Sequence, residues 1–181
     1  MITTLNEIES QPRYRSIWDK LLLGLGKTKA DDEPLNLMQI LEVNGIDDAV
    51  WALCCFDYKD YCLFNADVAE SVLHIYEQEN TSQAPRKAIN AIRDWHDGKI
   101  SDERLAAASY AASCASYDSH VAAAYASYAA SASASYAASY AASAHAAAAA
   151  AAWASYVASH AAAQAEKWAE IEALFIKHFG E

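Results

Sequence analysis

The stretch that decides the fold is residues 121–152, VAAAYASYAASASASYAASYAASAHAAAAAAA. It lies inside a longer tract, from Leu105 to Ala165, in which 32 of 61 residues are alanine and Asp118 is the only charged side chain. Alanine has the highest helix propensity of any residue, whereas disordered segments are rich in charge, proline and glycine. The tract therefore predicts helix in spite of its low complexity.

One continuous helix would not fit a compact domain. Residues 101–179 contain neither glycine nor proline, and as a single helix they would span about 120 Å. A compact chain of this length has a radius of gyration of about 16 Å. We therefore expect the segment to fold back, with turns at 117–119 and near 143–145. Its helices would pack closely, because small side chains let helix axes approach.

The first 100 residues have the composition of an ordinary helical domain, and we expect one domain over 1–181. Apolar periodicity, Pro at helix starts and Gly after helix ends predict an all-α array of about eight helices, including those of the alanine-rich segment 101–179. In the first part the predicted helices cover 13–23, 35–43, 47–56, 60–78 and the stretch between Pro85 and Gly98, after which Ser101 begins the alanine-rich part.

The predicted helix 60–78 is amphipathic. One face is expected to be buried and the other to be polar, following the 3.6-residue period. The apolar stripe comprises Cys62, Ala66, Ala69, Leu73 and Tyr76, and the opposite side carries Asp67, Glu70, Ser71 and His74.

The net charge of −11 argues against nucleic acid and anionic membranes as partners, because both need a basic surface. It is compatible with a basic protein partner or with mimicry of nucleic acid, but the favoured interpretation is that acidity keeps an alanine-rich protein soluble. The N-terminus lacks the layout of a signal peptide, and the alanine tract is too polar to predict a membrane span. We expect a cytoplasmic protein whose four cysteines, Cys54, Cys55, Cys62 and Cys114, are buried free thiols. No cofactor or metal site is predicted.

The best charged constellation combines two neighbouring helices. Glu70 and His74 are i, i+4 neighbours, which would suit an acid–base pair or part of a metal site. The favoured interpretation is a solvated face with a salt bridge between the two helices to Arg86. The candidate binding residues of this region are Asp67, Glu70, His74, Arg86, Arg93 and Trp95.

A second candidate lies in the alanine-rich part. If its helices fold back, tyrosine and histidine side chains could line a pocket for a planar or phosphorylated small molecule. The favoured interpretation is that the tyrosines fill gaps between alanine seams and that the histidines lie outside. The candidate residues are Tyr125, Tyr128, Tyr136, Tyr140 and His145.

Four segments together resemble an immunity protein family of bacteria and phages, over residues from about 35 to 175. They are EVNGIDDAVWALCCF, LFNADVAESVLHIYE, APRKAINAIRDWHDGKIS and the final EKWAEIEALF. The family has an arginine just before the proline of the third segment, with acidic residues ahead of it, whereas this chain has Ala84 there. The matching positions are Ala66, Ala69, Glu70, Leu73, Pro85, Arg86, Ala88, Ile89, Arg93, Trp95, Gly98 and Ile100.

The resemblance implies a non-enzymatic protein that neutralises a toxin or effector by direct binding. An alternative is a phage counter-defence protein that captures a host defence protein or a small nucleotide signal. An ice-binding protein is disfavoured, because threonine is absent after Thr81 and tyrosines interrupt the alanine seams. Those seams would also suit a homo-oligomer.

Overall fold

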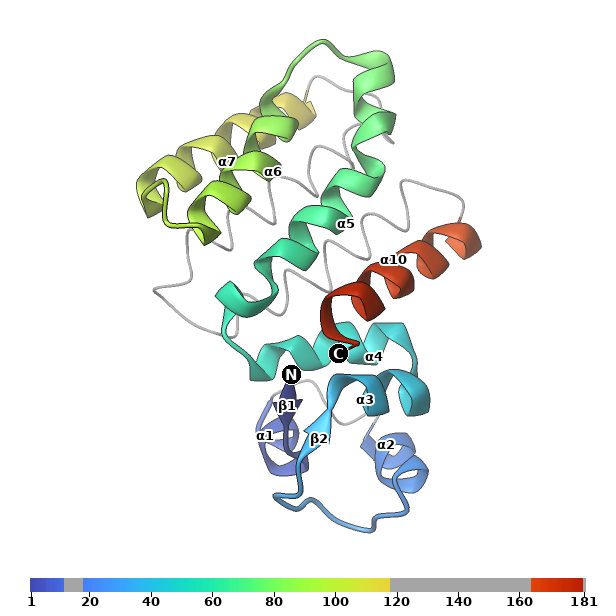
Figure 1. The fold of residues 1–181 in the computed structure, drawn as a ribbon. Coiled ribbons are helices and arrows are strands. Elements are labelled where there is room, and N and C mark those ends of the chain that lie inside the picture. The colour runs from blue at the N-terminus through green and yellow to red at the C-terminus, as the bar shows by residue number, and fades with distance from the viewer. Residues whose placement is uncertain (12–17, 118–163, 181) are drawn as a thin grey trace.

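The computed structural model describes residues 1–11, 18–117 and 164–180. Within these ranges the fold is an all-α array of eight α-helices, as the sequence predicts (Figure 1). The elements are β1 (Ile2–Thr3), α1 (Leu5–Glu9), α2 (Trp18–Gly24), β2 (Leu35–Asn36), α3 (Leu37–Asn44), α4 (Ile46–Ala52), a 3₁₀ turn (Leu53–Cys55), α5 (Tyr58–Glu79), α6 (Ala84–His96), α7 (Asp102–Tyr117) and α10 (Gln164–Phe179).

The long helix α5 connects the two ends of the described fold (Figure 1). It packs against α6, which in turn packs against α7. The C-terminal helix α10 lies against α5 and also contacts α3 and α4. The N-terminal elements α1, β1, β2 and α2 gather at the other end, beside α3 (Figure 1).

Helix α1 and the pair of strands β1 and β2 were not predicted. Helix α1 begins with a capping box, in which the Thr4 side chain accepts from the Glu7 backbone and Glu7 accepts from the Thr4 backbone. Strands β1 and β2 pair antiparallel, with Ile2 opposite Asn36 and Thr3 opposite Leu35. The Thr-x-x-Glu spacing was visible in the sequence, but the strand pairing joins segments more than 30 residues apart.

Helix α3 begins at Leu37, two residues later than the predicted helix 35–43, because Leu35 and Asn36 form strand β2. Asn36 caps α3, and its side chain and that of Gln39 satisfy each other's backbone amides at 2.9 and 3.0 Å. Gly45, at a φ of 97°, ends α3 and allows α4 to begin directly after it. The expected turn at 117–119 lies at and beyond the end of the described part of α7, and the one near 143–145 lies outside the described residues.

Helix α5 is buried on more than one side. The apolar stripe from Cys62 to Tyr76 is buried as predicted, but Phe64, Asn65 and Val68 are buried as well. The reason is α10, whose Phe175 and Phe179 rings stand 5.7 and 5.5 Å from the Phe64 ring. The buried side of α5 is therefore wider than the predicted stripe, while Asp67, Glu70 and Ser71 are half-buried and His74 is exposed on the predicted polar side.

The cysteines are free, as expected, but they are not all buried. Cys54 and Cys62 lie in the interior, Cys55 is half-buried and Cys114 is exposed on α7. Burial raises the pKa of Cys62 to about 12. No described helix is both long and apolar enough to cross a membrane.

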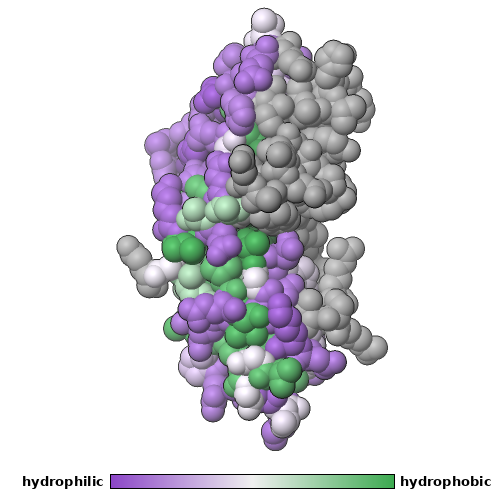
Figure 2. Space-filling view, turned by 90° about the vertical axis from the view of Figure 1, so that its right-hand side faces the viewer, coloured by the Kyte–Doolittle hydropathy of each residue, from purple (hydrophilic) through white to green (hydrophobic). Residues whose placement is uncertain are grey.

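A band of hydrophobic side chains lies on one face of the molecule, between hydrophilic flanks (Figure 2). It runs from the level of α10 over α3 and α4 towards α2 (Figures 1 and 2). Within this part of the molecule, Leu23 on α2 is 80% exposed and Ile176 on α10 is 45% exposed.

Candidate functional site

Charged side chains meet where α5, α6 and α10 adjoin, and we call this group the charged cluster. The spacing of its members places them on the facing sides of α5 and α6, because residues seven apart in a helix share a face. The α10 members come from that helix's last turn. The charged cluster comprises Asp67, Glu70, Glu77, Arg86, Arg93, Lys177 and His178.

At one end of the charged cluster, Arg86 holds two carboxylates of α5. Its Nε and Nη2 donate to the two oxygens of Glu77 at 2.6 and 2.7 Å, a bidentate pair. Its Nη1 donates to Glu70 Oε1 at 3.3 Å. The hydrogen bond from Arg86 holds the pKa of Glu77 below its usual value, so Glu77 stays ionised near neutral pH.

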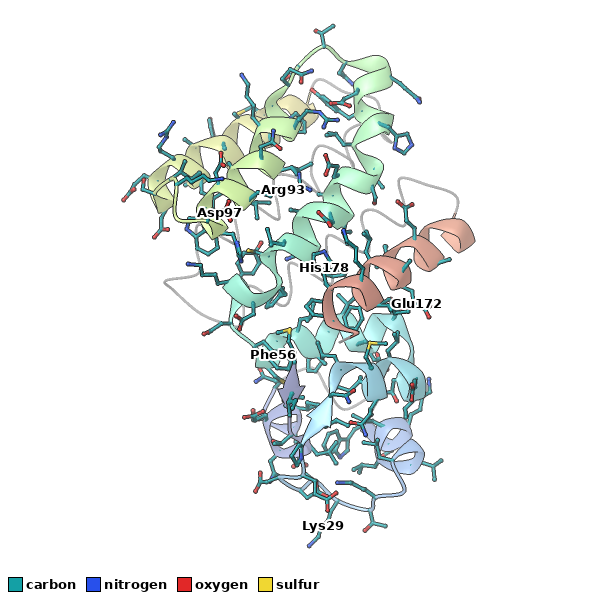
Figure 3. All side chains as sticks on the ribbon, in the orientation of Figure 1. Lys29, Phe56, Arg93, Asp97, Glu172 and His178 are labelled. Atoms are coloured by element: carbon teal, nitrogen blue, oxygen red, sulfur yellow. The ribbon has the colours of Figure 1, made fainter. Side chains whose placement is uncertain are left out.

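At the other end, Asp67 is shared between α6 and α10. Its Oδ1 accepts from Arg93 Nη2 at 2.8 Å, and its Oδ2 lies 3.1 Å from both Lys177 Nζ and His178 Nε2. Arg93 Nη2 also donates to Glu70 at 2.5 Å. Figure 3 shows Arg93 and His178 on their respective helices, on either side of α5.

Asp67 is the half-buried centre of this arrangement, with a side chain only 21% exposed. Burial alone would raise its pKa, but the hydrogen bonds from its three partners outweigh burial and hold the pKa below 3.8. The neighbouring His178 ring packs edge-on against Phe64 at 6.0 Å, next to the aromatic core. The charged cluster therefore ties α10 to α5 beside their apolar contact.

The predicted salt bridge between the helices to Arg86 is present: Arg86 contacts Glu70 and Glu77 of α5, and Arg93 also contacts Glu70. His74 lies outside the charged cluster. It is exposed, and no hydrogen bond joins it to Glu70, whose carboxylate faces the two guanidinium groups instead. The alternative of a Glu70–His74 acid–base pair is thus not assembled in this structure.

Trp95 also lies apart from the charged cluster, at the turn between α6 and α7. Its Nε1 donates to Asp102 Oδ1 at 2.7 Å. Its ring lies 6.2 Å from that of Tyr58, and Lys59 Nζ is 6.0 Å from its centre. These contacts fix the start of α5 against the α6–α7 turn, which is a structural role.

Sequence reasoning missed three members of the charged cluster. Glu77 follows Glu70 by seven residues, so the helical period could have identified it. Lys177 and His178 had no such signal, because they come from a helix more than 100 residues further along the chain. The candidates Tyr125, Tyr128, Tyr136, Tyr140 and His145 lie outside the described residues, and the pocket they would line remains a prediction.

The negative and positive charges of the charged cluster balance each other. Its three carboxylates face two guanidinium groups and one ammonium group, with His178 beside them. Both oxygens of the Glu70 carboxylate accept from guanidinium groups, Oε1 from Arg86 and Oε2 from Arg93. Across the described residues, no three His, Cys, Asp or Glu side chains are grouped so that they could hold a metal ion.

Comparison with protein-family models, curated proteins and solved structures gives no match.

Proposed function

We propose that this chain is a non-enzymatic, cytoplasmic binding protein of the immunity type, which neutralises a protein toxin or effector by direct contact. The observation that carries the proposal is the distribution of charge. The carboxylates of the charged cluster are paired with cationic groups, whereas carboxylates on α3, α4 and α10 stand without an ion pair to any described residue. These are Glu42, Asp47 and Glu172.

This distribution favours binding over catalysis. The strongest acid–base candidate of the sequence, Glu70, is engaged by two arginines that hold helices together. The unpaired carboxylates lie at the surface, where they add to a net charge of −11. Such a surface raises the association rate with a basic protein and disfavours acidic ones.

A growth assay tests the proposal. The chain is co-expressed with toxins encoded beside its gene, and growth is compared with cells that express the toxin alone. We expect one toxin to be neutralised and to co-purify with the chain as a complex of fixed stoichiometry. Rescue without a complex, or with covalent change of the toxin seen by mass spectrometry, would contradict a binding mechanism.

A further inference from the structure

The hydrophobic band, in which Leu23 and Ile176 are exposed and Val43 and Ile46 half-buried, has an acidic border on the same helices. We define the apolar band as Leu23, Val43, Ile46 and Ile176. On α2, Asp19 precedes Leu23 by four residues, and on α10, Glu172 precedes Ile176 by four, so each pair shares one side of its helix. At the α3–α4 corner, Glu42 and Asp47 flank Val43 and Ile46 in sequence.

The members of the apolar band lie on adjoining elements. A side chain added at Gly24 would collide with Val43, so the end of α2 is in direct contact with α3. Helix α10 contacts both α3 and α4. Figure 2 shows hydrophobic residues gathered on one face, and Figure 3 shows Glu172 on α10 near α4.

The α3–α4 corner within the band is open. Gly45 has a φ of 97°, and apart from Gly45 and its two neighbours in the chain no atom lies within 4 Å of where its Cβ would stand. Val43 and Ile46, which are half-buried, lie on the two sides of this corner. The four bordering carboxylates, Asp19, Glu42, Asp47 and Glu172, have no ion pair with any described residue.

We propose that the apolar band binds a basic, amphipathic helical segment of a protein partner. Apolar side chains of that helix would cover Leu23 and Ile176, and its lysines or arginines would reach the bordering carboxylates. This inference rests on the proposed function and identifies the surface that performs it. Exposed aliphatic side chains of this size mark interaction sites when they form a continuous patch.

The acidic border favours a basic helix over two other possible partners, a second copy of the chain and an anionic lipid surface. A second copy of the chain would bring the same carboxylates to the interface, where like charges oppose association. Anionic lipid headgroups would be repelled by the same border. A cationic helix pairs each of the four carboxylates while it covers the apolar centre.

A labelled synthetic helix provides the test. One peptide carries leucines along one face with lysines on both flanks, and a matched peptide carries glutamates in place of the lysines. Binding to the full chain is followed by fluorescence anisotropy at low and high salt. We expect saturable binding of the lysine peptide only, weakened by salt.

Matched variants locate the binding. Leu23→Ser and Glu42→Lys should each weaken binding of the lysine peptide at least about fivefold, as loss of a central interface contact does. Tyr110→Ser on α7 and Glu9→Lys on α1 remove an exposed ring and a carboxylate elsewhere and should change it less than about twofold. Glu9 and Glu42 both lie in the last turn of a helix, where lysine suits the helix dipole, so both variants should fold.

Each contrary result overturns the inference. The inference is wrong if the lysine peptide shows no saturable binding, if the glutamate peptide binds equally well, or if the control variants weaken binding as much as Leu23→Ser and Glu42→Lys do. Sedimentation showing a dimer of the chain that Leu23→Ser dissociates would also overturn it, since the band would then bind a second copy. If Leu23→Ser and Glu42→Lys still neutralise a toxin fully, the band is excluded while the proposed function stands. If the peptide binds the band but no toxin is neutralised, only the proposed function fails.

Discussion

Replacing Asp67 by asparagine should loosen α10 from the rest of the fold. The substitution keeps the shape of the side chain but removes the charge that Arg93, Lys177 and His178 contact. Asp67 is 21% exposed and His178 20%, so these contacts are shielded from solvent more than surface pairs are. Lys177 is 67% exposed and can turn to water at little cost.

The magnitude follows from these exposures. Hydrogen bonds to a charged, half-buried group contribute about 1–2 kcal/mol each, and exposed ion pairs contribute between about 0 and 1 kcal/mol. Arg93 retains Glu70 in the variant, which offsets part of the loss. We therefore expect Asp67→Asn to lower the free energy of unfolding by about 2 kcal/mol, which for a chain of this size lowers Tm by about 4–8 °C.

Thermal and urea unfolding, followed by circular dichroism, measure this change. Glu172→Gln is the matched control, because it also removes one carboxylate, but from a surface position of α10 with no described ion pair. Its effect on the free energy of unfolding should stay within about 0.5 kcal/mol. If Asp67→Asn destabilises the fold no more than Glu172→Gln, the charged cluster does not tie α10 to α5 and our reasoning about it is refuted.

The remaining predictions concern acid, the core and the thiols. Because the folded-state pKa values of Asp67 and Glu77 lie below their ordinary values of 3.8 and 4.5, their stabilisation is complete above pH 4.5 and lost as pH falls below those values. Tm should therefore drop in that range, and less steeply in Asp67→Asn. Phe175→Ala empties a fully buried position and should lower the free energy of unfolding by about 3–5 kcal/mol, measured by urea titration; a loss below about 1 kcal/mol would show that α10 does not pack on Phe64. Iodoacetamide should label the exposed Cys114 well before Cys62, because the Cys62 thiol is buried and its pKa is raised to about 12. Mass spectrometry at successive times measures the order of labelling, and the reverse order would contradict the placement of α5 in the core.

Much of the helical architecture could be predicted because its signals are local. Pro85 and Gly98 bracket α6, and the Gly98 φ of 72° explains why glycine follows the helix end. The burial of a second side of α5 could not be predicted, because Phe64 is covered by α10 from the far end of the chain. The pairing of β1 with β2, which lie more than 30 residues apart in the chain, could not be predicted for the same kind of reason.

In the candidate site too, contacts between neighbouring helices could be predicted and contacts with the distant helix α10 could not. Glu70 and Arg86 lie on consecutive helices joined by a short connection. A salt bridge between these helices to Arg86 could therefore be predicted from the sequence. The contact of His178 with Asp67 depends on tertiary packing that no helical period records. The unpaired carboxylates that border the apolar band could not be predicted either, because a sequence does not show which carboxylates form an ion pair.

An inhibition titration tests the central claim most directly. A purified toxin that the chain neutralises is titrated with wild type and with Glu70→Gln, and its residual activity is measured. A binding protein predicts an end point at a fixed whole-number ratio of chain to toxin, with the same end point for both proteins. Complete inactivation by a small fraction of one equivalent, abolished in Glu70→Gln, would instead show turnover at the charged cluster and contradict the account.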